Sequence, residues 1–136
     1  MTLCSSLWLN AQNFIHPGML HTQADLDRTK AKVEAGEEPW ASAYRKLLTS
    51  PHVSLDWKAA PVEKIVRGGR TIWEPDPDNY QSAYRDAATA YQCALVWHIS
   101  GDKAYADKSV QILNAWAKTC KKVSGDTNAC LAYGLY

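Results

Sequence analysis

The chain has 136 residues, which is enough for one domain and no more. Its formal net charge of +1 gives no signal for nucleic acid, so we expect no nucleic-acid partner. Nothing approaches the roughly 20 apolar residues of a membrane span, so we expect no membrane partner. Six Trp and seven Tyr stand against one Phe, and these rings suit either sugar stacking or ordinary core packing.

The first residues do not fit a helical pattern. Leu3, Leu7, Trp8 and Leu9 precede Asn10-Ala11-Gln12, as at the end of a secretory signal. A complete signal has a basic start and an apolar core of roughly 7–15 residues, and both are missing. We therefore interpret residues 1–13 as a signal remnant or a disordered start.

Two helices are predicted next, at 22–35 and 38–49. Thr22 and Asp25 have the spacing of a capping box, and Gly36 is placed to end the first helix. The second helix carries an apolar stripe and stops before Pro51. The stripe consists of Trp40, Ala43, Tyr44, Leu47 and Leu48.

The stretch 50–78 is predicted to be irregular. A loop of this length is usually functional or disordered, and Trp57, Ile72 and Trp73 make it too apolar for a typical disordered linker. Cations outnumber the single Glu63 between positions 58 and 70, and Gly68-Gly69 would let the backbone approach a ligand. The loop either binds an acidic sugar or crosses the fold with its Trp residues as anchors. The cations are Lys58, Lys64, Arg67 and Arg70.

Two long helices are predicted at 79–99 and 103–121, with a turn at Ser100 to Asp102 and a broken start beyond 128. The apolar faces are wider than a two-stranded seam needs, which indicates neighbours on more than one side and hence a helical layer or ring. On the first helix we place Ser82, Arg85, Asp86, Thr89 and Gln92 outward and Tyr80, Ala83, Tyr84, Ala87, Ala88, Tyr91, Ala94, Leu95, Trp97 and His98 inward. The second stripe is Tyr105, Val110, Ile112, Leu113, Trp116 and Cys120.

The cysteines and histidines give weaker signals. Cys93 reads as a small buried filler, and Cys120 and Cys130 could form a disulfide in an oxidising compartment. No His/Cys cluster has zinc-ligand spacing, so we expect no metal, and nothing indicates another cofactor. His98 is interpreted as a core histidine and His52 as a surface residue or a substrate contact.

An ordered set of short motifs carries a family resemblance. Ser100 to Lys108 reads SGDKAYADK and Ile112 to Trp116 reads ILNAW. Further pieces are His16 to Leu20 (HPGML), Pro61-Val62, Arg67-Gly68-Gly69 and Leu131 to Tyr136 (LAYGLY). This set resembles the N-terminal part of the alginate-lyase family of polysaccharide lyases, whose α/α toroid is shared with the chondroitin AC lyase superfamily. The resemblance implies an all-α fold in which residues 14–136 form an incomplete toroid of antiparallel hairpins, truncated at the C-terminus.

The resemblance also implies a function: β-elimination on a uronic-acid polymer such as alginate, in a secreted protein (periplasmic if bacterial). The family's neutralising Asn-His motif and catalytic Tyr lie well downstream, and no Asn-His pair occurs here. We therefore expect catalytic residues beyond Tyr136 and an inactive fragment. The alternative function is a non-catalytic helical-repeat module that binds carbohydrate or protein.

Five residues are predicted to contact the acidic polysaccharide. Cations pair with uronate carboxylates, aromatic rings stack on sugars, and an amide at a helix start can donate to an anion. The predicted substrate-binding residues are Arg67, Arg70, Trp73, Asn79 and Tyr80.

Overall fold

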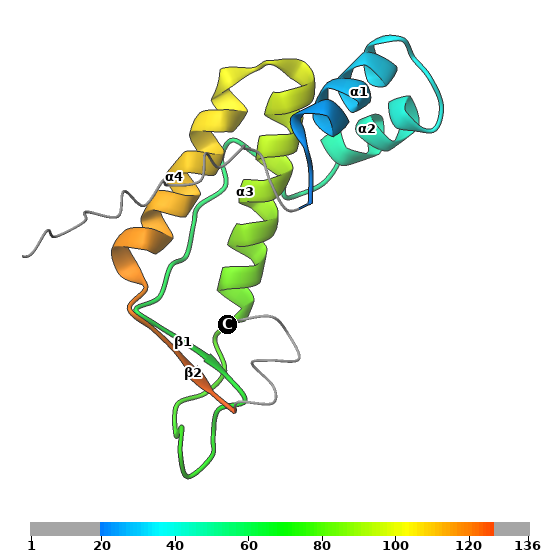
Figure 1. Cartoon of the computed structure of the whole chain (residues 1–136). Coiled ribbons are helices and arrows are strands. Elements are labelled where there is room, and N and C mark those ends of the chain that lie inside the picture. The colour runs from blue at the N-terminus through cyan, green and yellow to red at the C-terminus, as the bar shows by residue number, and fades with distance from the viewer. Residues whose placement is uncertain (1–19, 127–136) are drawn as a thin grey trace, which may run out of the picture.

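The computed structural model describes residues 20–126, and four helices and two strands lie in that range. Figure 1 shows α3 and α4 antiparallel and side by side, with α1 and α2 beside the C-terminal end of α3 and both strands near its N-terminal end. The elements are α1 (Gln23–Glu34), α2 (Trp40–Leu48), β1 (Lys64–Arg67), α3 (Gln81–Ser100), α4 (Lys103–Thr119) and β2 (Lys122–Gly125). The predicted start at 1–13, the break beyond 128 and Cys130 lie outside the described residues.

The predicted helices and their caps are confirmed. Gly101 ends α3 with a φ of +76°, and its N–H donates to the Trp97 carbonyl at 2.7 Å. Asp102 starts α4 by accepting from the Ala104 N–H at 3.0 Å. Thr22 and Asp25 form the predicted capping box at α1. The hairpin predicted for 79–121 is therefore present, and α4 ends slightly earlier, at Thr119.

The described residues are mostly helical, as expected, and a small parallel sheet corrects the expectation of an irregular 50–78. Strand β1 pairs with β2 in the register Lys64 to Lys122 and Arg67 to Gly125. The whole α3–α4 hairpin is the connection that a parallel pair requires. The two β-branched residues at the centre of β1, Ile65 and Val66, are buried.

The buried face of α3 is also different from the prediction. Asp86 and Thr89, which we placed outward, are 1% and 0% exposed, whereas Tyr91, which we placed inward, is 44% exposed. The buried positions recur at helical spacing and consist of Asp86, Thr89, Ala90, Cys93 and Val96. His98 is half-buried and packs on the Trp97 ring with 4.4 Å between ring centroids.

Hydrogen bonds explain why a carboxylate occupies that face. Asp86 accepts from Trp57 Nε1 at 2.8 Å, from the Ala60 N–H at 2.8 Å and from Trp116 Nε1 at 2.7 Å. A buried carboxylate with several donors is compatible with the interior, because its lost hydration is replaced. This Asp86 cluster (Asp86, Trp57 and Trp116) joins the 50–63 segment, α3 and α4.

Helix α4 buries a narrow face against these groups. Ser109 and Ile112 are buried, while Val110 and Leu113 are 55% and 57% exposed on the outer side. Cys93 is fully buried, as predicted for a small filler, and burial raises the pKa of its thiol. None of the helices formed by residues 20–126 combines the length and apolar character that crossing a bilayer requires.

Candidate functional site

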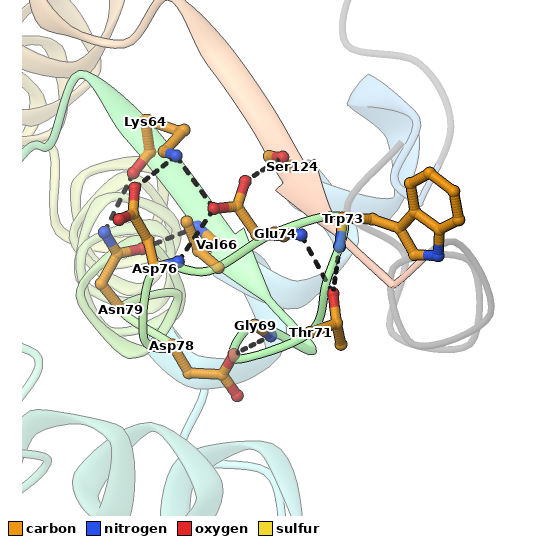
Figure 2. Close-up of polar contacts among 10 residues, drawn as sticks. All are labelled: Lys64, Val66, Gly69, Thr71, Trp73, Glu74, Asp76, Asp78, Asn79 and Ser124. Atoms are coloured by element: carbon orange, nitrogen blue, oxygen red, sulfur yellow. Dashed lines mark hydrogen bonds and ion pairs between the residues drawn. The ribbon is translucent and has the colours of Figure 1, made fainter.

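The chain between β1 and α3 turns back on itself through backbone hydrogen bonds. The Arg70 N–H donates to the Asp76 carbonyl at 3.1 Å, and the Thr71 N–H donates to the Glu74 carbonyl at 2.9 Å. The Thr71 hydroxyl accepts from the backbone N–H groups of Trp73 and Glu74, as Figure 2 shows. This 68–79 loop is therefore an ordered turn with defined positions for its side chains.

Glu74 fastens this loop to both strands. It is 4% exposed, its carboxylate accepts from Lys64 Nζ at 3.0 Å, and it also accepts from the Ser124 hydroxyl (Figure 2). Lys64 forms a second ion pair with Asp76. The hydrogen bond from Ser124, followed by that from Lys64, lowers the pKa of Glu74 from 4.5 to about 2. The hydrogen bonds of Lys64, first with Asp76 and then with Glu74, raise the pKa of Lys64.

Gly69 allows two parts of the 68–79 loop to approach each other closely. We predicted that Gly68-Gly69 would let a ligand approach, but a Cβ at Gly69 would lie 2.0 Å from the Asp76 carbonyl oxygen. The Gly69 N–H donates to Asp78 Oδ1 at 2.8 Å. The close approach is therefore between two parts of the same loop.

Asn79 has a structural role at the edge of β1. Its Oδ1 accepts from the Val66 N–H at 2.8 Å, and its Nδ2 donates to the Lys64 carbonyl at 2.9 Å. The side chain thus takes the place of a neighbouring strand, as Figure 2 shows. We predicted this amide as a sugar contact, and in the structure its oxygen and one N–H are bonded to the backbone of β1.

Arg67 and Tyr80 are brought together. The Arg67 guanidinium carbon lies 3.8 Å from the Tyr80 ring centroid and 6.0 Å from that of Tyr84. The two Tyr rings meet edge to face with centroids 5.2 Å apart. Tyr84 is 37% exposed. We call Arg67, Tyr80 and Tyr84 the arginine–tyrosine face.

Trp73 and Arg70 lie elsewhere on the loop. Trp73 is 88% exposed and its neighbour Ile72 is 89% exposed. Figure 2 shows the Trp73 indole pointing away from the polar cluster around Glu74. Arg70 is exposed at the turn with a φ of +60°. Of the five predicted residues, Arg67 and Tyr80 are in contact with each other, and Asn79 is hydrogen-bonded to β1. The other two, Arg70 and Trp73, are exposed on the 68–79 loop.

A second aromatic contact lies farther along the same side of α3. His21 Nε2 and the Tyr91 hydroxyl are 2.6 Å apart, and the two rings are stacked with centroids 6.0 Å apart. Tyr91 follows Tyr84 by seven positions, so the two side chains share one side of the helix. The apolar pattern of the sequence predicts both rings in the core. The helical spacing is correct, but it does not distinguish a half-exposed aromatic face from a buried one.

The search for a metal centre covers the described residues, and the search for relatives covers the chain. Within residues 20–126, no group of three or more His, Cys, Asp or Glu side chains is arranged to hold a metal ion. Comparison of the chain with protein-family models, with curated proteins and with solved structures finds no match.

Proposed function

We propose that the chain belongs to a polysaccharide lyase of the alginate-lyase type, which cleaves a uronic-acid polymer by β-elimination within an α/α toroid. The resemblance of the motifs at Ser100 to Lys108 and Ile112 to Trp116 supports this proposal, and the arginine–tyrosine face supports the choice of an acidic sugar. The half-exposed rings along α3 would line the substrate path of the toroid. The protein would act on polysaccharide outside the cytoplasm.

The position of Arg67 carries the proposal. Its guanidinium lies over the Tyr80 ring at the end of β1, and β1 is held by β2 on one edge and by Asn79 on the other. A guanidinium binds a carboxylate through two parallel hydrogen bonds, and a tyrosine ring offers an apolar surface to a sugar. An arginine held next to aromatic rings therefore matches the two parts of a uronate residue.

The proposed role of this chain is to hold substrate. β-Elimination needs a donor that neutralises the uronate carboxylate, a base for the C5 proton and an acid for the leaving oxygen. In the resembled family these groups are an Asn-His motif and a Tyr, and no Asn-His pair occurs among these 136 residues. The 136-residue chain is therefore expected to bind an acidic oligosaccharide and to produce no ultraviolet absorbance from an unsaturated product. Robust turnover by this chain would contradict that division of roles.

Calorimetric titration with a uronate trisaccharide and a neutral trisaccharide tests the proposal. Arg67→Ala should weaken uronate binding about tenfold at low salt, since a charge-assisted hydrogen bond is lost. The factor should shrink as salt rises, because screening already weakens the ionic contribution. The affinity of Arg67→Lys for the uronate should lie between those of wild type and Arg67→Ala, because lysine keeps the charge and lacks the planar guanidinium.

Arg45→Ala is the matched control. Arg45 is an exposed arginine on α2 that pairs with Glu38 at 2.9 Å, far along the chain from the proposed face. Its removal changes the net charge by the same amount and should leave uronate affinity unchanged. If Arg67→Ala and Arg70→Ala together leave low-salt affinity unchanged, the loop is only a structural connection and the proposed substrate face is wrong.

A further inference from the structure

A small pocket lies on another side of the hairpin, between the 57–59 segment and α4. Its volume is about 230 Å³, below the roughly 300 Å³ at which pockets for drug-sized ligands begin. A space of this size suits a single ring. The lining residues are Trp57, Lys58, Ala59, Gln111, Ile112 and Ala115.

Both walls of the pocket are held in place by the protein. Trp57 Nε1 donates to Asp86 Oδ1 at 2.8 Å, which fixes the indole at one wall. Lys108 Nζ donates to the Trp57 carbonyl at 3.2 Å and to Gln111 Oε1 at 2.8 Å, which ties that wall to α4. The pocket is therefore formed before any ligand arrives, so binding need not order the loop.

The polar groups at this pocket favour an anion. Lys58 is exposed, and none of the ion pairs among residues 20–126 involves it. Both acceptors of Lys108 are uncharged oxygens. Because an ammonium group can only donate, Gln111 must present Oε1 to Lys108, which leaves its NH₂ group facing away as a donor. The lining residues include no carboxylate.

The pocket is separate from the arginine–tyrosine face. Asp86, which holds the pocket's indole, lies two positions after Tyr84 on α3. At 3.6 residues per turn the two side chains point about 200° apart around the helix. A ligand in the pocket would therefore not touch Tyr84.

We propose that this pocket is a second carbohydrate site, which takes one carboxylated sugar residue. Lys58 pairs with the carboxylate, the Gln111 amide donates to a hydroxyl, and Trp57 contacts the ring. The choice of a sugar acid as ligand rests on the proposed function. Two sites on different sides of one hairpin would let the protein hold two places on one polymer or two polymers at once.

Nuclear magnetic resonance titration of the ¹⁵N-labelled 136-residue chain with sodium glucuronate tests this proposal. The Trp57 indole N–H and the Gln111 side-chain amide should shift and saturate together. Lys58→Ala should weaken binding about threefold to fivefold at low salt, as expected for an exposed charge. Gln111→Ala should also weaken it, while both variants keep the wild-type melting temperature. Lys46→Ala removes an exposed lysine on α2 and should change nothing.

The controls separate the ligand classes and the two proposals. Glucose at equal concentration should shift these signals far less, and acetate should not saturate them. Equal binding of glucose and glucuronate would overturn the assignment of an anion site. Shifts that do not saturate with glucuronate would show that the pocket is not a binding site. The pocket signals should respond to glucuronate equally in wild type and in Arg67→Ala. Loss of the response in Arg67→Ala alone would overturn the second site and leave the arginine–tyrosine face as the binding site.

Discussion

Asp86 on α3 and Trp116 on α4 are joined by a hydrogen bond of 2.7 Å from the indole nitrogen to a buried carboxylate oxygen. The same carboxylate accepts from Trp57 and from the Ala60 backbone. One side chain therefore connects three segments that are distant in sequence.

Asp86→Ala is expected to destabilise the protein by roughly 3–5 kcal/mol, because buried donors lose their acceptor. Asp86→Asn should lose less, since the amide oxygen still accepts while the amide nitrogen cannot. Urea unfolding followed by tryptophan fluorescence measures both. Asp107→Asn is the control, because Asp107 is a 65% exposed partner of Lys103 and should cost about 0.5 kcal/mol or less. A loss this small for Asp86→Ala would contradict the Asp86 cluster.

Asn79→Ala is expected to cost roughly 1–3 kcal/mol, because the Val66 N–H loses its acceptor in a buried strand. Asn79→Asp should recover only part of the loss, since a carboxylate accepts from Val66 but cannot donate to the Lys64 carbonyl. Denaturant unfolding of the three proteins should give the stability order wild type, Asp variant, Ala variant. If both variants match the wild type in stability but bind uronate more weakly, Asn79 is a ligand contact instead.

The stability of the fold should fall as the pH is lowered from about 4.5 toward 2. The pKa of Glu74 is about 2 in the folded protein and 4.5 when unperturbed, so its contribution is complete above 4.5 and is lost as folded Glu74 becomes protonated. Glu74→Gln should lower stability above pH 4.5 and flatten the curve below it. Ser124→Ala, which removes the main cause of the shift, should flatten it partly. If the stability of both variants falls below pH 4.5 as steeply as that of wild type, the assigned role of Glu74 is wrong.

Gly125→Ala is expected to disrupt the pairing of the two strands. A Cβ there would lie 1.7 Å from the Arg67 carbonyl oxygen, and the φ of Gly125 is +130°. Gly101→Ala is the matched comparison, because Gly101 also has a positive φ, of +76°, but a Cβ at that position would meet no atom within 4 Å. It should cost only about 1 kcal/mol, for backbone strain. Equal melting temperatures for the two variants would contradict the close approach at Gly125.

Local signals in the sequence were sufficient for the helices and their ends. Thr22 with Asp25, and Gly101 with Asp102, act through groups within a few residues, so the sequence contains the whole interaction. Strand β1 could not be predicted in this way, because its four residues form a strand only by pairing with β2 and with the Asn79 side chain.

The candidate site was predicted only in part for the same reason. Arg67 and Tyr80 are in contact because β1 ends beside the start of α3. The sequence analysis treated 50–78 as an irregular loop, so it could not predict this contact. Asp86 was placed outward because polarity alone decides that choice in a helical pattern. Its burial depends on hydrogen bonds from the indoles of Trp57 and Trp116, which lie in other segments. Nothing in the sequence near either Trp indicates that both donate to the same carboxylate.

The parallel pairing of β1 with β2 has a consequence for the order of folding. The two strands meet only after the chain between them has closed a loop that contains all of α3 and α4. Closing a long loop costs more entropy than joining two helices across a short turn. The helical hairpin is therefore expected to form early and the strand pair late, so that mutations in β1 or β2 should mainly speed unfolding and leave the refolding rate nearly unchanged.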